Sequence, residues 1–353
     1  MKIPLIYALH SGNLYGTERM ALYTAGGLTA DFDPVIMAPP GPALEEARAT
    51  GYEAVPFESV VQFSGALRKQ LAKSGKRVAF LATGVMHSAV CLAWNKLYRR
   101  RIAHLQLVHG GAAEALSYGR KGKLNGQPVQ FVAVSAYVRE RLIANGVNQA
   151  QIRVIENFLP DALARNCPQR VQFGGEGLRR LIVISRLDPE KRVDVLLEAL
   201  EAAPDAGHFE VHVYGTGWNA DDLKARAARS NLNVAFEGFS TTVREALAGS
   251  DLLVHLCPVE PFGLAIIEAM AAGVPALVPD AGGAGSLVEN GVSGFRFEAN
   301  NPAAVMSKIR EVADLSPERL NSVTAEGRRL LGTRFSQSAR IADYRNLLME
   351  SLA

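Results

Sequence analysis

The chain has few cysteines and no long apolar run. Its 353 residues include three Cys, at positions 91, 167 and 257, without a C-x-x-C pair or a His cluster, so neither a disulfide framework nor a zinc site is expected. The apolar run over residues 1–9 is too short for a signal peptide. The weakly polar stretch over residues 79–94 contains Thr, Gly, His and Ser and falls short of a membrane span. We therefore expect a cytoplasmic protein.

Acidic residues are missing from one long segment. None occurs between Glu58 and Glu114, an interval with nine Lys and Arg residues. Residues 1–165 have 19 Lys and Arg against 11 Asp and Glu, and the remainder has 19 against 24. Trp94 and Tyr98 alternate with the cations of residues 96–101, a mixture that suits a helix lying on anionic lipid headgroups. Peripheral contact with an anionic membrane is one hypothesis, and a solvated basic face is the other. Nucleic acid is not expected, because no recognition motif accompanies the charge.

The length fits two domains of ordinary size. An irregular stretch over residues 157–177 separates two sets of strand-like runs that alternate with helical patterns. The runs are 3–9, 34–38, 53–57, 77–82, 104–108 and 130–134, with a short one at 152–155, and then 181–185, 209–214, 233–236, 252–256 and 275–278. Such alternation implies parallel sheets covered on both faces. We predict α/β domains over residues 1–165 and 166–334, followed by an amphipathic segment over 335–353.

Two carboxylates, Glu260 and Glu268, stand eight positions apart at the start of a predicted helix. At 1.5 Å rise per residue they are about 12 Å apart, too far to share a proton but suited to the two ends of an elongated ligand. The amides of Phe262, Gly263 and Leu264 open the helix between them, where free N–H groups attract phosphate. A nucleotide sugar has this shape. The alternative is a helix with a solvated Glu at each end.

Two cations follow the buried strand over residues 181–184. Arg186 lies at the strand's carboxyl end and Lys191 precedes the next helical pattern. Ligands of open α/β sheets bind at that edge, where Arg can bind phosphate in two places and Lys supplies a compact charge. A solvated role is the alternative for either residue alone.

These motifs carry a family resemblance. The sequence S-R-L-x-x-E-K at residues 185–191, followed by E-P-F-G-L-x-x-x-E at 260–268, resembles the signature of family 4 glycosyltransferases. The similarity extends through most of the C-terminal half, including residues 236–238, 268–275 and Gly282-Gly283. One departure follows these glycines, since the chain has Ser286 where the family usually has an acid.

The resemblance implies a retaining enzyme of the GT-B fold, with two Rossmann-like domains facing a cleft and a C-terminal helix that packs back on the N-terminal domain. It implies that Arg186 and Lys191 bind the diphosphate of a UDP- or GDP-sugar, that Glu260 binds the sugar hydroxyls and that Glu268 binds the ribose. The N-terminal domain would bind a glycan or lipid-linked acceptor in polysaccharide or lipopolysaccharide synthesis. No metal or other cofactor is expected, because the cations are built in.

The N-terminal half adds three candidates. Gly16 and Glu18, in the element Gly-Thr-Glu-Arg, follow the first strand, and the resemblance implies that they line the cleft; helix capping by Glu18 is an equal alternative. His109 ends a strand, and the resemblance implies that it approaches the transferred sugar, although glycines follow it where the family often has Asp. A strand-end His is otherwise a structural residue.

Two patterns compete with this interpretation. Asp31-Phe-Asp33 imitates a metal-binding acid pair but precedes the second strand, at the wrong edge of the sheet. Gly215 and Gly217 belong to a G-x-G-x-x-A fingerprint, with Glu237 near the position of a ribose-binding acid. A dehydrogenase would explain this turn but not the cations or the two glutamates, and the resemblance also implies a ligand-binding glycine turn here. A sugar-nucleotide epimerase, a phosphorylase and a non-catalytic nucleotide-sugar-binding protein remain alternatives.

Overall fold

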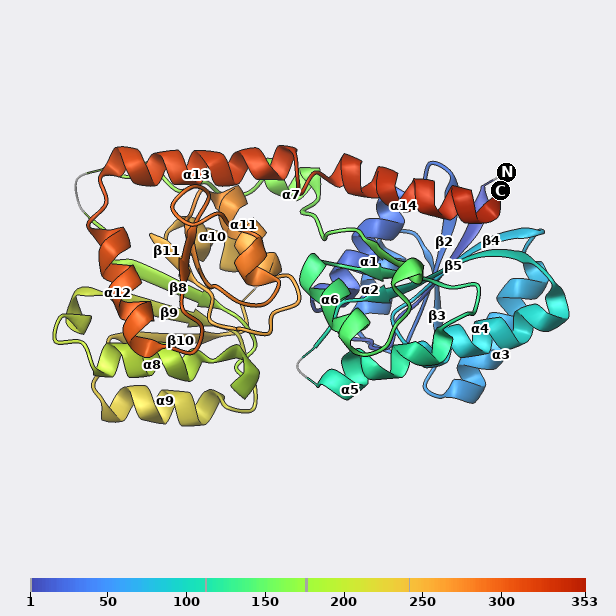
Figure 1. Ribbon diagram of the computed structural model, residues 1–353, viewed down its shortest axis with the longest axis horizontal. Helices are drawn as coiled ribbons and strands as arrows, with labels where there is room; N and C mark the ends of the chain where they lie inside the picture. Colours follow the sequence, from blue (N-terminus) through green and yellow to red (C-terminus); the bar gives the residue numbers. More distant parts are fainter. Residues whose placement is uncertain (1, 112, 175–176, 241) are drawn as a thin grey trace. The chain divides into compact units, whose positions relative to one another are not determined.

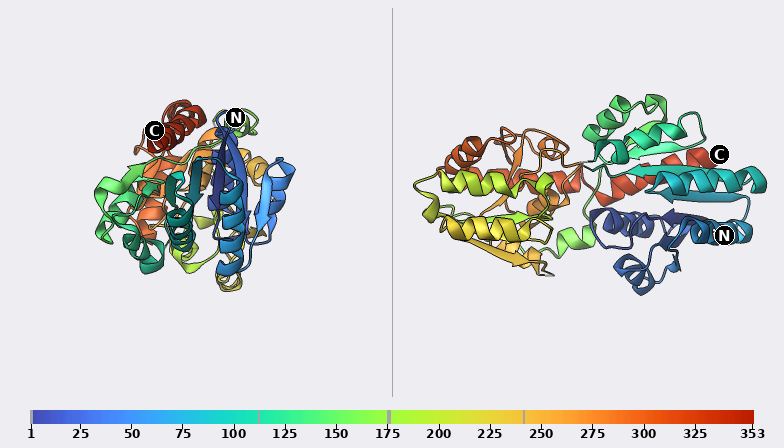
Figure 2. Two further views of the ribbon diagram at one scale, coloured as in Figure 1. Left: turned by 90° about the vertical axis from the view of Figure 1, so that its right-hand side faces the viewer. Right: turned by 90° about the horizontal axis from the view of Figure 1, so that it is seen from below.

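A computed structural model describes residues 2–111, 113–174, 177–240 and 242–353 (Figure 1). Met1, in the apolar run over residues 1–9, and Gly175, in the irregular stretch over residues 157–177, lie outside these described residues. The chain divides into two units: residues 1–157 with 337–353, and residues 158–336. The division after residue 157 comes earlier than the predicted border after residue 165. Each unit is a parallel sheet with helices on both faces (Figure 2).

Unit 1 has a seven-stranded sheet in the order β3-β2-β1-β4-β5-β6-β7. Its strands are β1 (Ile3–Ala8), β2 (Phe32–Ala38), β3 (Glu53–Pro56), β4 (Arg77–Ala82), β5 (Arg101–Val108), β6 (Gln130–Ala133) and β7 (Ile152–Val154). Its helices are α1 (Gly16–Gly27), α2 (Pro42–Ala49), α3 (Val60–Lys73), α4 (Val85–Tyr98), α5 (Glu114–Ser117), α6 (Ala136–Ala144) and α14 (Gln337–Leu352), with 3-10 turns η1 (Gly119–Leu124) and η2 (Gln149–Gln151).

Alternate residues of β1 face two different cores. Leu5 and Tyr7 pack with α1, α2 and α14, whereas Ile6 and Ala8 pack with α3 and α4. This alternation is the period-two pattern of a strand buried on both faces. Tyr344 of α14 is buried in the first core, and Arg345 donates to Asp31 with an Nε–Oδ2 distance of 2.6 Å. The last helix therefore belongs to unit 1, and Asp31 is engaged in its attachment.

Unit 2 has a six-stranded sheet in the order β10-β9-β8-β11-β12-β13. Its strands are β8 (Arg180–Ile184), β9 (Glu210–Tyr214), β10 (Val234–Gly238), β11 (Leu252–Val254), β12 (Ala276–Pro279) and β13 (Phe295–Phe297). Its helices are α7 (Asp161–Arg165), α8 (Val193–Glu201), α9 (Ala220–Arg229), α10 (Val243–Ala248), α11 (Leu264–Ala272), α12 (Pro302–Ala313) and α13 (Pro317–Gly332), with 3-10 turns η3 (Pro189–Lys191), η4 (Ala206–His208) and η5 (Ala284–Ser286).

The strand order identifies where ligands are expected. In each sheet the order reverses once, between β1 and β4 in unit 1 and between β8 and β11 in unit 2. Ligands of such sheets bind outside the carboxyl ends of the strands at this switch point. Two details differ from the sequence predictions: β13 was not predicted, and β2 begins at Phe32, so that Asp33 lies inside the strand. A three-residue strand such as β13 is too short to show a period.

Candidate functional site

The site in unit 2 is centred on an ion pair at the sheet's switch point. Lys191 follows β8 in η3, and Glu260 lies in the loop between β11 and α11. The Lys191 Nζ donates to Glu260 Oε2 at 2.7 Å, and the two side chains are only 15% and 16% exposed. The sequence predicted both residues in a donor site, and the structure brings them into direct contact.

Each member of the pair stabilises the charge of the other. Burial alone would raise the pKa of Glu260 and lower that of Lys191. The opposing charges outweigh burial, so the pKa of Glu260 lies below its usual value and that of Lys191 above it. Both groups are therefore charged at neutral pH.

His255, which sequence reasoning did not select, completes this cluster. It directly follows β11, and its Nε2 lies 3.6 Å from Glu260 Oε2. Burial, with Lys191 adding to it and Glu260 opposing it, lowers the pKa of His255 to about 4, so the ring is neutral at physiological pH. Its position at the carboxyl end of a strand next to the switch point was the available signal.

Arg186 lies in the loop that leaves β8. Its guanidinium contacts the carboxylates of Asp188 and Glu190, with 2.9 Å from Nη2 to Glu190 Oε1, and its side chain is 51% exposed. Arg186 also contributes to the lowered pKa of Glu260. It therefore lies close to the buried pair and remains accessible to solvent.

The predicted glycine turn supports the Arg186 loop. Leu187 N donates to Thr216 O at 2.9 Å. A Cβ on Gly215 would lie 1.8 Å from Ser185 O, and one on Gly217 would lie 2.5 Å from Leu187 C. Close approach of two loop backbones therefore accounts for both glycines, and the dinucleotide fingerprint needs no dinucleotide to explain it. Glu237 accepts from His212 Nδ1 at 2.7 Å.

A second glycine loop holds Glu260. Gly283 N donates to Glu260 O at 2.6 Å, and a Cβ on Gly283 would lie 2.0 Å from Pro261 O. Ser286 Oγ in turn donates to Gly283 O at 2.7 Å. The residue that replaces the family's acid thus braces the loop behind Glu260.

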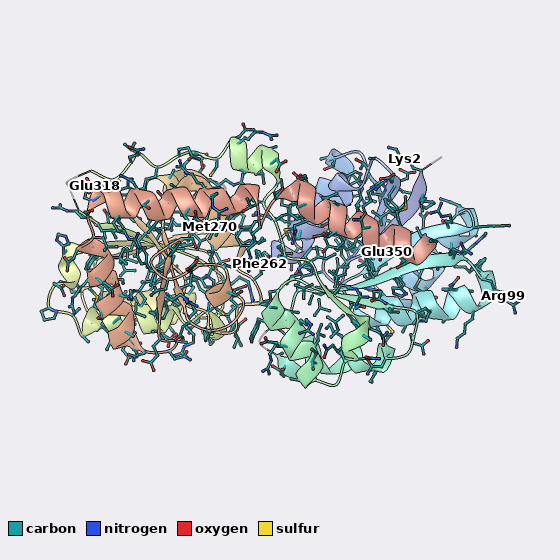
Figure 3. The ribbon with its side chains drawn as sticks, turned by 45° about the horizontal axis from the view of Figure 1, so that its top comes forward. Lys2, Arg99, Phe262, Met270, Glu318 and Glu350 are labelled. Atoms are coloured by element: carbon teal, nitrogen blue, oxygen red, sulfur yellow. The ribbon has the colours of Figure 1, made fainter. Side chains whose placement is uncertain are left out.

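The start of α11 has the geometry expected of a phosphate-binding helix terminus. Gly263 is the N-cap with φ of 103°, a conformation that strains any residue with a side chain. Leu264 is the first helical residue, so its amide lacks a partner within the helix. Phe262, labelled in Figure 3, is 2% exposed and packs edge-on against Phe335 at 5.9 Å. Its side chain anchors the turn.

Glu268 lies farther along α11 than the ion pair. It is half-buried. Burial raises the pKa of the Cys167 thiol, and the charge of Glu268 adds to this. Glu268 is the fifth residue of α11, whereas Glu260 lies in the loop before the helix.

The candidates of unit 1 lie near its own switch point. Gly16 is the first residue of α1. Glu18 is 2% exposed, and its Oε2 accepts from Tyr15 N at 3.2 Å, which is the helix-capping alternative and leaves it little access to a ligand. His109 follows β5 and lines a cavity with His10, Thr83 and Lys121. Burial, with His10 and Lys121 adding to it, lowers the pKa of His109 to about 3.

Metal-binding and membrane-spanning features are not seen in the described parts of the chain. No group of three or more His, Cys, Asp or Glu side chains there is placed to hold a metal ion. None of the helices described is both long and apolar enough to cross a bilayer. The three cysteines are buried free thiols.

Two family models match most of the chain. The model described as Glycosyltransferase Family 4 matches residues 15–162, and the model described as Glycosyl transferases group 1 matches residues 169–329. The poly(ribitol-phosphate) alpha-N-acetylglucosaminyltransferase of Staphylococcus aureus is 27% identical over 54% of this chain and 38% of its own length. The GDP-mannose-dependent alpha-mannosyltransferase of Mycobacterium tuberculosis is 30% identical over 51% of this chain and 48% of its own length.

Solved structures agree on the fold. Anabaena Alr3699/HepE, in a complex with UDP, has a TM-score of 0.83 and 19% identity, and the match covers 99% of this chain and 100% of that one. The matches to the two enzymes above span only about half or less of those enzymes' own lengths. The two parallel-sheet units, the motifs of residues 185–191 and 260–268 and the two family models together place this chain in glycosyltransferase family 4, with the GT-B fold.

Proposed function

We propose that the chain transfers a sugar from a UDP- or GDP-sugar to a hydroxyl group of an acceptor, with retention of configuration at the anomeric carbon. The observation that carries the proposal is the buried Lys191–Glu260 pair at the switch point of unit 2, beside the open end of α11. An ammonium, a carboxylate and free amides at one place suit a ligand that joins phosphates to a hydroxyl-rich ring.

Lys191 and Glu260 can form further hydrogen bonds with such a ligand. Lys191 has three N–H donors and uses one on Glu260, while a carboxylate has about four lone-pair sites. We assign the diphosphate to Lys191, Arg186 and the amides of residues 262–264, the sugar hydroxyls to Glu260 and the ribose to Glu268. Negative charge grows on the diphosphate as the glycosidic bond breaks, so the cations stabilise the transition state.

In unit 1, the proposal assigns the acceptor side to the region of Gly16 and His109. A glycan or lipid-linked acceptor in cell-surface polysaccharide or lipopolysaccharide synthesis is supported by the relative named for acting on poly(ribitol phosphate). An epimerase or a silent binding protein of the same fold remains the alternative, and the experiment below separates these outcomes.

The test is a screen of labelled UDP- and GDP-sugars for hydrolysis and transfer, combined with thermal unfolding in UDP, GDP and NAD. A ligand at 100 times its Kd stabilises the folded state by about 2.7 kcal/mol, so the correct nucleotide raises the melting temperature and NAD does not. Release of free sugar excludes the silent binder, and retention of the donor's C1–O bond with an inverted ring hydroxyl identifies an epimerase. Protection by NAD alone would overturn the proposal.

The same assay tests metal dependence. Because the proposal assigns charge neutralisation to Lys191, Arg186 and the helix amides, we expect EDTA to leave turnover unchanged. Loss of activity in EDTA with recovery in Mg²⁺ would contradict this.

The basic segment of unit 1 carries the separate proposal of peripheral membrane contact. Arg99, labelled in Figure 3, is the C-cap residue after α4, and Leu97 near the end of this helix is 70% exposed. Trp94 packs on the core and donates to Ser64 Oγ at 2.9 Å, and Arg101 donates to Ala353 O at 2.7 Å. The contact is therefore assigned to Leu97 and Arg99. Binding to anionic liposomes should fall in Leu97→Ser with Arg99→Ala, and unchanged binding would exclude this surface.

A further inference from the structure

A cavity of about 750 Å³ opens at the switch point of unit 1. It lies where β1, β4 and β5 end, at His10, Thr83 and His109, and η1 closes another side.

The described side chains in this lining that are charged at neutral pH are all positive. Arg120, Lys121 and Lys123 come from the single turn η1, and none of the described lining residues is Asp or Glu. Lys121 is only 6% exposed, and its Nζ donates to the carbonyl of Ser117. Lysine is rarely buried without a carboxylate partner. Lys121 is paired with a carbonyl instead, so its positive charge is not compensated by the cavity lining.

The cavity also holds polar groups without partners. His87 is 8% exposed, and its Nδ1 has no hydrogen-bond partner among the described residues; the same is true of His109 Nε2. Gly84 is the N-cap of the fourteen-residue helix α4, and Val85 and Met86 are its first two residues. The leading amides and the positive dipole end of this helix favour an anion. Donors thus reach the cavity from three different elements.

Burial disfavours the charged forms of the basic groups around the cavity. Burial lowers the pKa of Lys121 to about 8, and burial, with His10 adding to it, lowers the pKa of His87 to about 4. Burial and Lys121 lower the pKa of His10. A bound anion would favour the protonated forms that burial now disfavours.

We infer that this cavity binds a phosphate group of the acceptor, through Arg120, Lys121, Lys123 and the first turn of α4. The inference rests on the proposed function, because it concerns the molecule that receives the sugar. A phosphate fits better than a neutral glycan, since three cations without a carboxylate discriminate by charge. Met86 and Leu116, which also line the cavity, are 54% and 57% exposed, and the lipid or sugar attached to the phosphate is assigned to this exposed side.

The experiment measures binding of inorganic phosphate to the full chain by calorimetry in saturating UDP, with the imidazole NMR signals as a second readout. UDP occupies the proposed donor site, so phosphate binding that persists belongs elsewhere. Arg120→Ala with Lys123→Ala should weaken phosphate binding at least tenfold and leave donor hydrolysis unchanged. Affinity should also fall as pH rises through about 8, because Lys121 then loses its proton.

The matched control is Lys69→Ala with Lys96→Ala, which removes the same charge from exposed positions of α3 and α4 outside the cavity. It should leave phosphate binding unchanged. Equal loss in both double variants, competition between phosphate and UDP, or no phosphate binding by a protein that hydrolyses its donor would each overturn the inference. Absence of donor hydrolysis would instead count against the proposed function, and phosphate binding would still decide whether the cavity is an anion site.

A second arm identifies the source of the phosphate. Binding to phosphatidylcholine vesicles that contain phosphatidic acid is compared with binding of glycerol phosphate in solution. Tighter binding of the vesicles, lost in Arg120→Ala with Lys123→Ala, assigns a lipid-linked phosphate. Tighter binding of glycerol phosphate assigns a soluble phosphorylated acceptor, and binding of neither overturns the inference.

Discussion

Lys191 and Glu260 show how a ligand-binding residue also stabilises the fold. Both side chains are mostly buried and compensate each other's charge. Removing one partner of such a pair leaves the other charge buried, which costs about 3–5 kcal/mol in comparable sites. A loss of activity after a single substitution therefore mixes lost catalysis with lost stability, and the two have to be separated.

Lys191→Ala is expected to lower both stability and turnover, because the buried Glu260 then loses its ion-pair partner. Adding Glu260→Gln should restore part of the stability, since the unpaired charge disappears, but should not restore turnover. Melting temperature and kcat of the single and double variants check this. Recovery of kcat with stability would show that Lys191 acts only as a structural partner of Glu260.

At the scale of elements, two glycine loops position the site residues. The Gly215–Gly217 turn supports the Arg186 loop, and the Gly282–Gly283 turn supports Glu260 through its backbone. In both cases the backbones approach more closely than any side chain permits. The sequence shows these glycines plainly, but a glycine in a loop is equally explained by a ligand, and the structure assigns them a packing role.

Gly283→Ala is expected to reduce kcat more than tenfold and to lower the melting temperature, because the new methyl group would overlap Pro261 O and displace Glu260. Gly207→Ala is the control, since nothing lies within 4 Å of a Cβ there. Kinetics and thermal unfolding of both variants provide the measurement. Wild-type turnover in Gly283→Ala would mean that this loop does not position Glu260.

At the scale of the whole molecule, buried neutral histidines couple stability to pH. Burial lowers the pKa values of His104 and His109 to about 3 and those of His87 and His255 to about 4. An unfolded His titrates near 6.5. Below that pH the unfolded chain binds protons that the folded chain does not, so stability is present above about pH 6.5 and is lost as pH falls toward 4.

Stability should therefore fall between pH 7 and pH 5, by about 1–2 kcal/mol for each buried histidine. His255→Gln should make the decrease shallower in unit 2 and leave unit 1 unaffected. Hydrogen exchange resolved along the chain at both pH values reads the two units separately. The same pH dependence of unit 2 with and without His255 would show that another group is responsible.

Part of the fold and of the candidate site could be predicted from local patterns in the sequence. The alternation of strands and helices predicted two parallel-sheet units, and the motifs around Arg186, Lys191 and Glu260 predicted the family, which the family models confirm. The three-residue strand β13 was not predicted, because so short a segment shows no period. The role of Glu18 was ambiguous, since capping and ligand binding use the same carboxylate.

The sequence by itself determined the fold class and the chemistry available, because helix and strand periods and motif spacing are properties of neighbouring residues. The tertiary structure alone decided which distant residues meet. Lys191 and Glu260 are 69 positions apart, and the cationic cavity joins the ends of three strands to one turn. Such contacts depend on strand order and on how closely loop backbones pack, which no local pattern encodes.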